Sequence, residues 1–159
     1  MPVLFRPGPY VCAEWDFGGL PVRLMATEGL EIRSLNDLFL AETEIYFKEL
    51  VPIIKKHQKT KDNPKGCIIM LQIENEYGFF GADIRYINAL RDMWDRLGID
   101  LEQYYVDWIY NARKSHWEGA NIGLNDFHSE LQYDYLRVLE PRGFIFGGEI
   151  YTGWLSHWG

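Results

Sequence analysis

Two glutamates, Glu76 and Glu149, each follow an apolar run of the kind shown by a strand that is buried on both faces. The first run covers residues 68–71 and the second covers residues 143–148. Because parallel strands end at one edge of a sheet, we expect both carboxylates at the same mouth. A carboxylate pair there is what retaining glycoside hydrolysis requires, one group acting as general acid and then base and the other as nucleophile, roughly 5–5.5 Å apart.

Glu76 and Glu149 could each instead be a loop glutamate that caps the next helix. Glu76 precedes a glycine loop and a predicted helix, so it is placed to cap that helix. Glu14 follows another extended run and could serve the site, or it could form a buried ion pair with Arg6 or Arg23. Asn75 could donate a hydrogen bond to a substrate hydroxyl, or it could hold its own loop together.

The elements that must position these residues alternate along the chain. Strands are predicted at residues 3–6, 68–71, 104–108, 120–124 and 143–148. Ser34 and Asp37 form a capping-box pattern that starts a helix, which Pro52 should kink or break near residue 51. A second helix runs from about residue 82 to Gly98. Asp126 is placed to cap a third, with Phe127, Leu131, Tyr135 and Val138 or Leu139 facing inward.

This alternation predicts an α/β protein with a parallel sheet of about five βα units. A closed eight-stranded barrel needs roughly 250 residues, and the sequence has 159. The sequence is therefore compatible either with a small doubly wound domain or with a slice of a barrel.

Composition and motifs exclude several other classes of protein. A formal charge of −7 argues against a nucleic-acid or anionic-membrane partner, and no apolar run is long enough for a membrane span. No signal peptide is visible at the start. Cys12 and Cys67 are expected at opposite ends of the sheet and therefore unpaired. Ligand spacing for a metal is not found around the histidines, and no nucleotide-binding glycine loop occurs. The histidines are His57, His116, His128 and His157.

Three segments in the same order resemble glycoside hydrolase family 35, the β-galactosidases. Residues 6–21 read RPGPYVCAEWDFGGLP and are similar to the family signature. Residues 72–78, QIENEYG, look like the family's acid/base segment, and residues 149–159, EIYTGWLSHWG, look like its nucleophile segment.

The resemblance implies a (β/α)₈ TIM barrel of which residues 1–159 would supply strands three to seven. Strands one, two and eight and the family's accessory β domains would be absent, and the isolated segment would be inactive. It implies Glu76 as acid/base and Glu149 as nucleophile. Galactose would be held by Cys12, Ala13, Glu14, Asn75 and Tyr151.

The expected substrates are β-galactoside oligosaccharides or glycoconjugates, with no cofactor and no metal. Secreted, periplasmic and lysosomal locations are all compatible with the resemblance, and the oligomeric state is left open. Two alternatives stay open as well: a retaining β-glycosidase with another sugar specificity, and an inactive carbohydrate-binding fragment.

Overall fold

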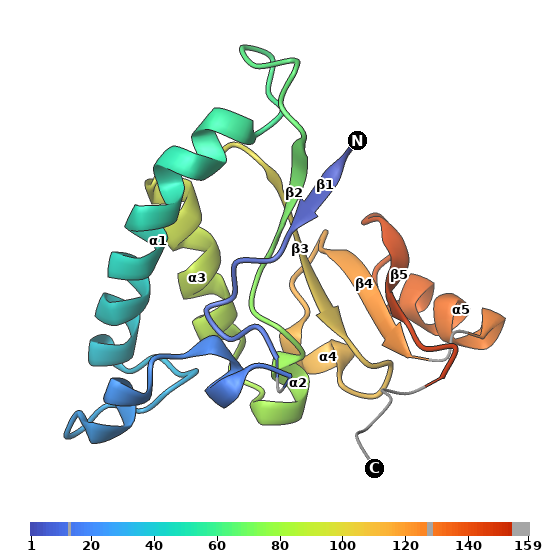
Figure 1. Cartoon of the computed structure of the whole chain (residues 1–159). Coiled ribbons are helices and arrows are strands. Elements are labelled where there is room, and N and C mark those ends of the chain that lie inside the picture. The colour runs from blue at the N-terminus through green and yellow to red at the C-terminus, as the bar shows by residue number, and fades with distance from the viewer. Residues whose placement is uncertain (13, 127–128, 154–159) are drawn as a thin grey trace.

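The computed structural model describes residues 1–12, 14–126 and 129–153. Within them, five parallel strands form one curled sheet, a half-barrel with helices between its strands (Figure 1). The strand order β1-β2-β3-β4-β5 follows the chain, as in the wall of a barrel, whereas a doubly wound sheet reverses direction at a switch point. The fold is thus that of an incomplete TIM barrel, as expected. The strands are β1 Val3–Phe5, β2 Ile68–Gln72, β3 Glu102–Asp107, β4 Asn121–Asp126 and β5 Ile145–Ile150.

The helices connect successive strands and cover the outside of the curled sheet. In Figure 1, α1 and α3 lie side by side along β2, and α5 lies at the far side near β5. The α-helices are α1 Asp37–His57, α2 Tyr77–Phe80, α3 Ile84–Arg96, α4 Ala112–Ser115 and α5 Glu130–Leu139. Two 3-10 helices, η1 Asp16–Gly19 and η2 Val22–Ala26, follow β1.

The core is divided between two clusters of buried side chains. The larger joins α1 and α3 to β2, and its centre is a stacked ring pair, Phe47 and Trp94, with centroids 3.8 Å apart. The smaller lies beneath α5 and contains Tyr105, Ile122 and Leu136. Burial of large apolar groups on the outer face of the strands therefore fixes the sheet and with it the strand ends.

The expected N-cap of α1 and the expected break near residue 51 were both wrong. The N-cap is Asn36, whose Oδ1 accepts hydrogen bonds from the backbone N–H groups of Leu38 and Phe39, each at 3.1 Å. Ser34 instead accepts from the backbone of Asn36. The helix also continues through Pro52 to His57 without a break.

Most expectations for α5 were wrong as well, although Leu139 does pack against the smaller cluster as expected. Its N-cap is Ser129, which forms a capping box with Gln132, while Asp126 is the last residue of β4. Leu136 is the buried residue of this helix, whereas Leu131 and Val138 are exposed. Tyr135 is exposed too, and Phe127 lies outside the described residues.

Candidate active site

The segment after β2 separates its two glutamates into different environments. Glu74 is buried and receives two hydrogen bonds from the Arg33 guanidinium, at 2.9 and 2.8 Å, and one from the Tyr86 hydroxyl at 3.1 Å. The Glu74 carboxylate therefore makes its hydrogen bonds inside the core. Glu76 is only partly buried and lies at the carboxyl end of the sheet.

The Glu76 carboxylate is held by side chains from the next two strands. Its Oε1 accepts from Trp108 Nε1 at 2.9 Å and from Asn125 Nδ2 at 3.0 Å. Glu76 does occupy the N-cap position of α2, but its side chain makes no capping hydrogen bond. The interpretation of Glu76 as a helix cap was therefore wrong, since the side chain is turned toward β3 and β4.

Glu149 lies near the end of β5 and receives two donors of a different kind. The Tyr151 hydroxyl donates to Oε2 at 2.7 Å, and the Arg6 guanidinium donates to Oε1. The same Arg6 nitrogen donates to Asn75 Oδ1 at 2.7 Å. Burial raises the pKa of Tyr151, and its hydrogen bond to Glu149 and the charges of Glu149 and Glu76 raise it further, so the phenol stays a donor at neutral pH.

Asn125 neighbours both Glu76 and Glu149. In the β4–β5 register, Asn125 is the partner of Glu149, after a bulge that lies past Leu124. Because its amide bonds to Glu76, Asn125 contacts one glutamate through its side chain and neighbours the other through its backbone. The rings of Trp108 and Tyr151, which bind the two glutamates separately, have centroids 5.7 Å apart. The structure thus brings the two glutamates to one end of the sheet.

A third acid at this end was not found by sequence reasoning. Asp107, the last residue of β3, is fully buried and its Oδ2 accepts from the Gly78 backbone N–H at 2.9 Å and from Ser115 Oγ at 2.7 Å. Burial raises the pKa of Asp107 to about 6, with a smaller contribution from the Glu76 charge. A polar residue at the end of a predicted strand was the signal available for Asp107 and for Asn125.

The expected sugar-binding group is described only in part. Glu14 is exposed, and a hydrogen bond with the Cys12 side chain lowers its pKa. Arg23 pairs with Glu42 and Arg6 with Glu149, so the interpretation of Glu14 as a buried ion pair was wrong. Ala13 lies outside the described residues. Cys12 and Cys67 are both partly buried, and they form no disulfide with each other.

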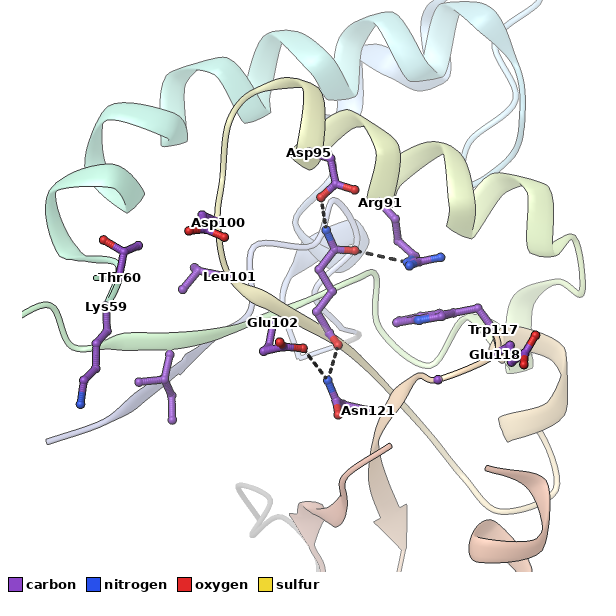
Figure 2. A pocket seen from close by; sticks show the side chains of 13 residues that line it. Lys59, Thr60, Arg91, Asp95, Asp100, Leu101, Glu102, Trp117, Glu118 and Asn121 are labelled. Carbon is purple, nitrogen blue, oxygen red and sulfur yellow. Dashed lines mark hydrogen bonds between the residues drawn. The ribbon is translucent and has the colours of Figure 1, made fainter. Parts of the chain in front are cut away.

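A separate hollow of about 520 Å³ lies at the opposite ends of the strands (Figure 2). Its polar side chains are paired with one another: Gln103 donates to Asp95 at 2.8 Å and accepts from Arg91 at 3.3 Å. Asn121 donates to the Gln103 backbone at 3.0 Å. Barrel enzymes carry their chemistry at the carboxyl ends of the strands, so this hollow is not the candidate active site.

Across residues 1–12, 14–126 and 129–153, no group of three or more His, Cys, Asp or Glu side chains is arranged to hold a metal ion. In the same ranges, no helix combines the length and hydropathy needed to cross a bilayer.

Comparison with known proteins extends over the whole chain. The model of the family described as Glycosyl hydrolases family 35 matches residues 1–159. The chain is 36% identical over 165 residues to a β-galactosidase of Felis catus and 37% identical over 167 residues to one of Homo sapiens. It is 34% identical over 163 residues to a β-galactosidase-1-like protein of Mus musculus. Each match covers 99% of this chain but only 24 or 25% of the relative, so the chain spans about a quarter of their length.

Proposed function

Because the chain belongs to glycosyl hydrolases family 35, we propose that it forms part of the catalytic barrel of a retaining β-galactosidase. In this proposal the described strands are the third to seventh of a (β/α)₈ barrel whose remaining strands and accessory domains lie outside residues 1–159. The substrates are β-galactosides, in line with the names of the similar proteins from Felis catus and Homo sapiens.

The observation that supports this function is the contrast between the two glutamates at one strand end. Glu149 is bound by a guanidinium and a phenol, donors that stabilise a carboxylate and suit a nucleophile. Glu76 is bound through one oxygen by two neutral N–H donors. We assign Glu149 as the nucleophile and Glu76 as the acid/base.

The reaction then has two steps. Glu149 attacks the anomeric carbon while the C–O bond to the leaving group breaks, and the protonated Glu76 gives its proton to that oxygen. Glu76, now ionised, takes a proton from water as the water oxygen attacks the anomeric carbon and the bond to Glu149 breaks. The product keeps the β configuration, and both carboxyl groups return to their starting states.

Asn75 is the best-supported contact for the sugar. Its Oδ1 accepts from Arg6 and from Gln72 Nε2, whereas its Nδ2 is buried with no hydrogen-bond partner in the part of the chain that the structure describes. A substrate hydroxyl would satisfy that donor. Cys12, Ala13, Glu14 and Tyr151 complete the proposed galactose site.

Activity should be tested in the longest reading frame that contains residues 1–159, with p-nitrophenyl β-D-galactoside as substrate. Glu149→Gln is expected to lower kcat by roughly 10⁴-fold or more, because the covalent step loses its nucleophile. The matched control is Glu118→Gln, which changes a glutamate whose side chain is 87% exposed at the other end of the sheet. An activated 2-fluoro-galactoside should label Glu149 covalently, and label on any other residue would refute the assignment.

A panel of nitrophenyl sugars decides the specificity. Faster hydrolysis of a glucosaminide or fucoside than of the galactoside would replace galactose as the proposed sugar. Sugar binding without hydrolysis by the whole protein would instead identify a carbohydrate-binding remnant.

A further inference from the structure

Both hydrogen bonds to the Glu76 carboxyl group are accepted by the same oxygen. Trp108 Nε1 and Asn125 Nδ2 donate to Oε1, at 2.9 and 3.0 Å, and no hydrogen bond reaches Oε2 from the residues that the structure describes. The two oxygens of this carboxyl group are therefore chemically distinct before any substrate binds.

The two donors come from different strands and are themselves fixed in place. Trp108 directly follows β3. Its ring packs edge-on against Phe79, with centroids 5.9 Å apart, and in a tilted contact against Tyr151, with centroids 5.7 Å apart. Asn125 lies within β4, where the sheet fixes its backbone. The orientation of the Glu76 carboxyl group is thus set from two directions.

Folding alone does not account for Asn125. The residue is fully buried, its Oδ1 has no hydrogen-bond partner in the described chain, and its one described side-chain hydrogen bond is the bond to Glu76. A buried amide with an unsatisfied oxygen weakens the fold. Gly148 makes room for this side chain, since a Cβ there would lie 2.6 Å from Asn125 Oδ1.

The chemistry of the donors determines where a proton can sit. An indole N–H and an amide N–H only donate, so the oxygen that faces both of them acts as an acceptor. When Glu76 is protonated, the O–H group therefore forms at Oε2, the oxygen that is left for a substrate.

We propose that Trp108 and Asn125 are positioning residues that hold Glu76 Oε1 as an acceptor and thereby direct the catalytic proton from Oε2 to the glycosidic oxygen. This proposal rests on the function proposed above, in which Glu76 is the acid/base. Trp108 and Asn125 themselves act through Glu76 and need not touch the reacting atoms.

The test compares two β-galactosides that differ in how much their leaving groups need a proton. A dinitrophenolate leaves without help, whereas the glucose of lactose must be protonated as it leaves. In the same long reading frame, Trp108→Phe and Asn125→Ala should each lower kcat/KM for lactose roughly 10-fold to 100-fold, the range for a lost hydrogen bond to a charged group. For the dinitrophenyl galactoside the loss should be less than about 3-fold, since proton transfer contributes little there.

The control variants change the same residue types away from Glu76. Trp117→Phe and Asn121→Ala alter a tryptophan and a buried asparagine at the opposite ends of β3 and β4, beside the hollow in Figure 2. Both should change the two kcat/KM values by the same factor, even where they lower the melting temperature. Asn125→Ala should leave the melting temperature almost unchanged. The Asn125 amide contributes little to stability, because its buried Oδ1 has no hydrogen-bond partner among the described residues.

The outcomes separate the two proposals. An active parent whose Trp108 and Asn125 variants lose both substrates equally, or lose neither, would overturn the positioning role and leave the proposed function intact. A parent that hydrolyses neither galactoside would overturn both. Should Trp108→Phe fail to fold, Asn125→Ala gives the same reading from a separate strand.

Discussion

The indole of Trp108 and the phenol of Tyr151 lie with ring centroids 5.7 Å apart, and each donates a hydrogen bond to a different glutamate. The proposed acid/base and the proposed nucleophile thus accept hydrogen bonds from the two members of one aromatic pair. A phenylalanine in place of either residue keeps an aromatic ring in this contact and removes only the hydrogen bond to that residue's own glutamate.

The first prediction concerns the Tyr151 hydroxyl. Tyr151→Phe keeps the ring contact but removes the donor to Glu149 Oε2, and we expect kcat to fall roughly 10-fold to 100-fold. Because burial and the neighbouring carboxylate raise the pKa of Tyr151, the phenol should remain a donor in mildly alkaline solution. The ratio of parent to variant kcat should therefore stay constant between about pH 6 and pH 9. A ratio that collapses toward one over this range would show that the phenol ionises there.

The second prediction concerns Arg6, which joins the nucleophile segment to the acid/base segment. Its guanidinium donates to Glu149 and to Asn75, so Arg6→Met should lower kcat/KM by roughly 10-fold to 100-fold. Arg6→Lys should recover only part of this loss, because an ammonium cannot reproduce the planar geometry of the guanidinium. Full recovery by lysine would mean that positive charge alone is required. The control is Arg85→Met, which changes an exposed arginine on α3.

The third prediction follows from the burial of Asp107. Burial, and to a smaller extent the Glu76 charge, raise the pKa of Asp107 from about 3.8 to about 6. Between these values the folded state binds more protons than the unfolded state, so the free energy of unfolding falls as the pH rises and then levels off above about pH 6. For one group the fall amounts to about 3 kcal/mol.

Asp107→Asn removes this titration while an amide oxygen can still accept from Gly78 and Ser115. Relative to the parent, the variant should therefore become more stable as the pH is raised from 4 to 7. Urea unfolding at several pH values measures the difference. A difference that does not vary with pH would contradict the buried, protonated aspartate.

The fourth prediction separates Glu74 from the catalytic pair. Its carboxylate is fully buried against the Arg33 guanidinium, so Glu74→Gln should lower the free energy of unfolding by about 3–5 kcal/mol. The loss arises because Arg33 is left as an uncompensated buried charge. A double variant, Arg33→Met with Glu74→Gln, should be more stable than Glu74→Gln alone. A Glu74→Gln protein with the same free energy of unfolding as the parent would contradict this prediction, because it would show that water compensates Arg33 for the lost carboxylate.

The fifth prediction concerns the open edges of the sheet. The outer edges of β1 and β5 pair with no other strand among the described residues, and Leu4, Phe144 and Ile150 are exposed there. Residues 1–159 expressed alone should therefore aggregate and show no turnover. Size-exclusion chromatography with a thermal melt is the measurement, and a monomer with one sharp cooperative transition would contradict the expectation.

Much of the fold was predictable because buried parallel strands leave continuous apolar runs in a sequence. The apolar runs before Glu76 and Glu149 predicted β2 and β5 together with the polar residues at their ends. Helix starts were less predictable. Ser34, Asn36 and Asp37 can all cap a helix, and only the path of the backbone selects Asn36.

The partners of the glutamates were not predictable in the same way. Trp108 and Asn125 reach Glu76 only because β2, β3 and β4 pair in one particular register. Register and bulges depend on the packing of neighbouring strands, which local sequence patterns do not fix. The resemblance to a family pointed to Glu76 and Glu149 but not to the residues that orient Glu76.

The backbone around Asn75 limits how this site can change. Glu74 and Glu76 both adopt left-handed conformations, with φ of 61° and 45°, which non-glycine residues adopt at a cost of roughly 1–3 kcal/mol each. A β-branched replacement at either position would increase this conformational cost, so few substitutions should be tolerated in this segment. Selection for new leaving groups would do better to randomise Tyr110, which is exposed, follows Trp108 by two residues in the chain and is free of such a backbone demand.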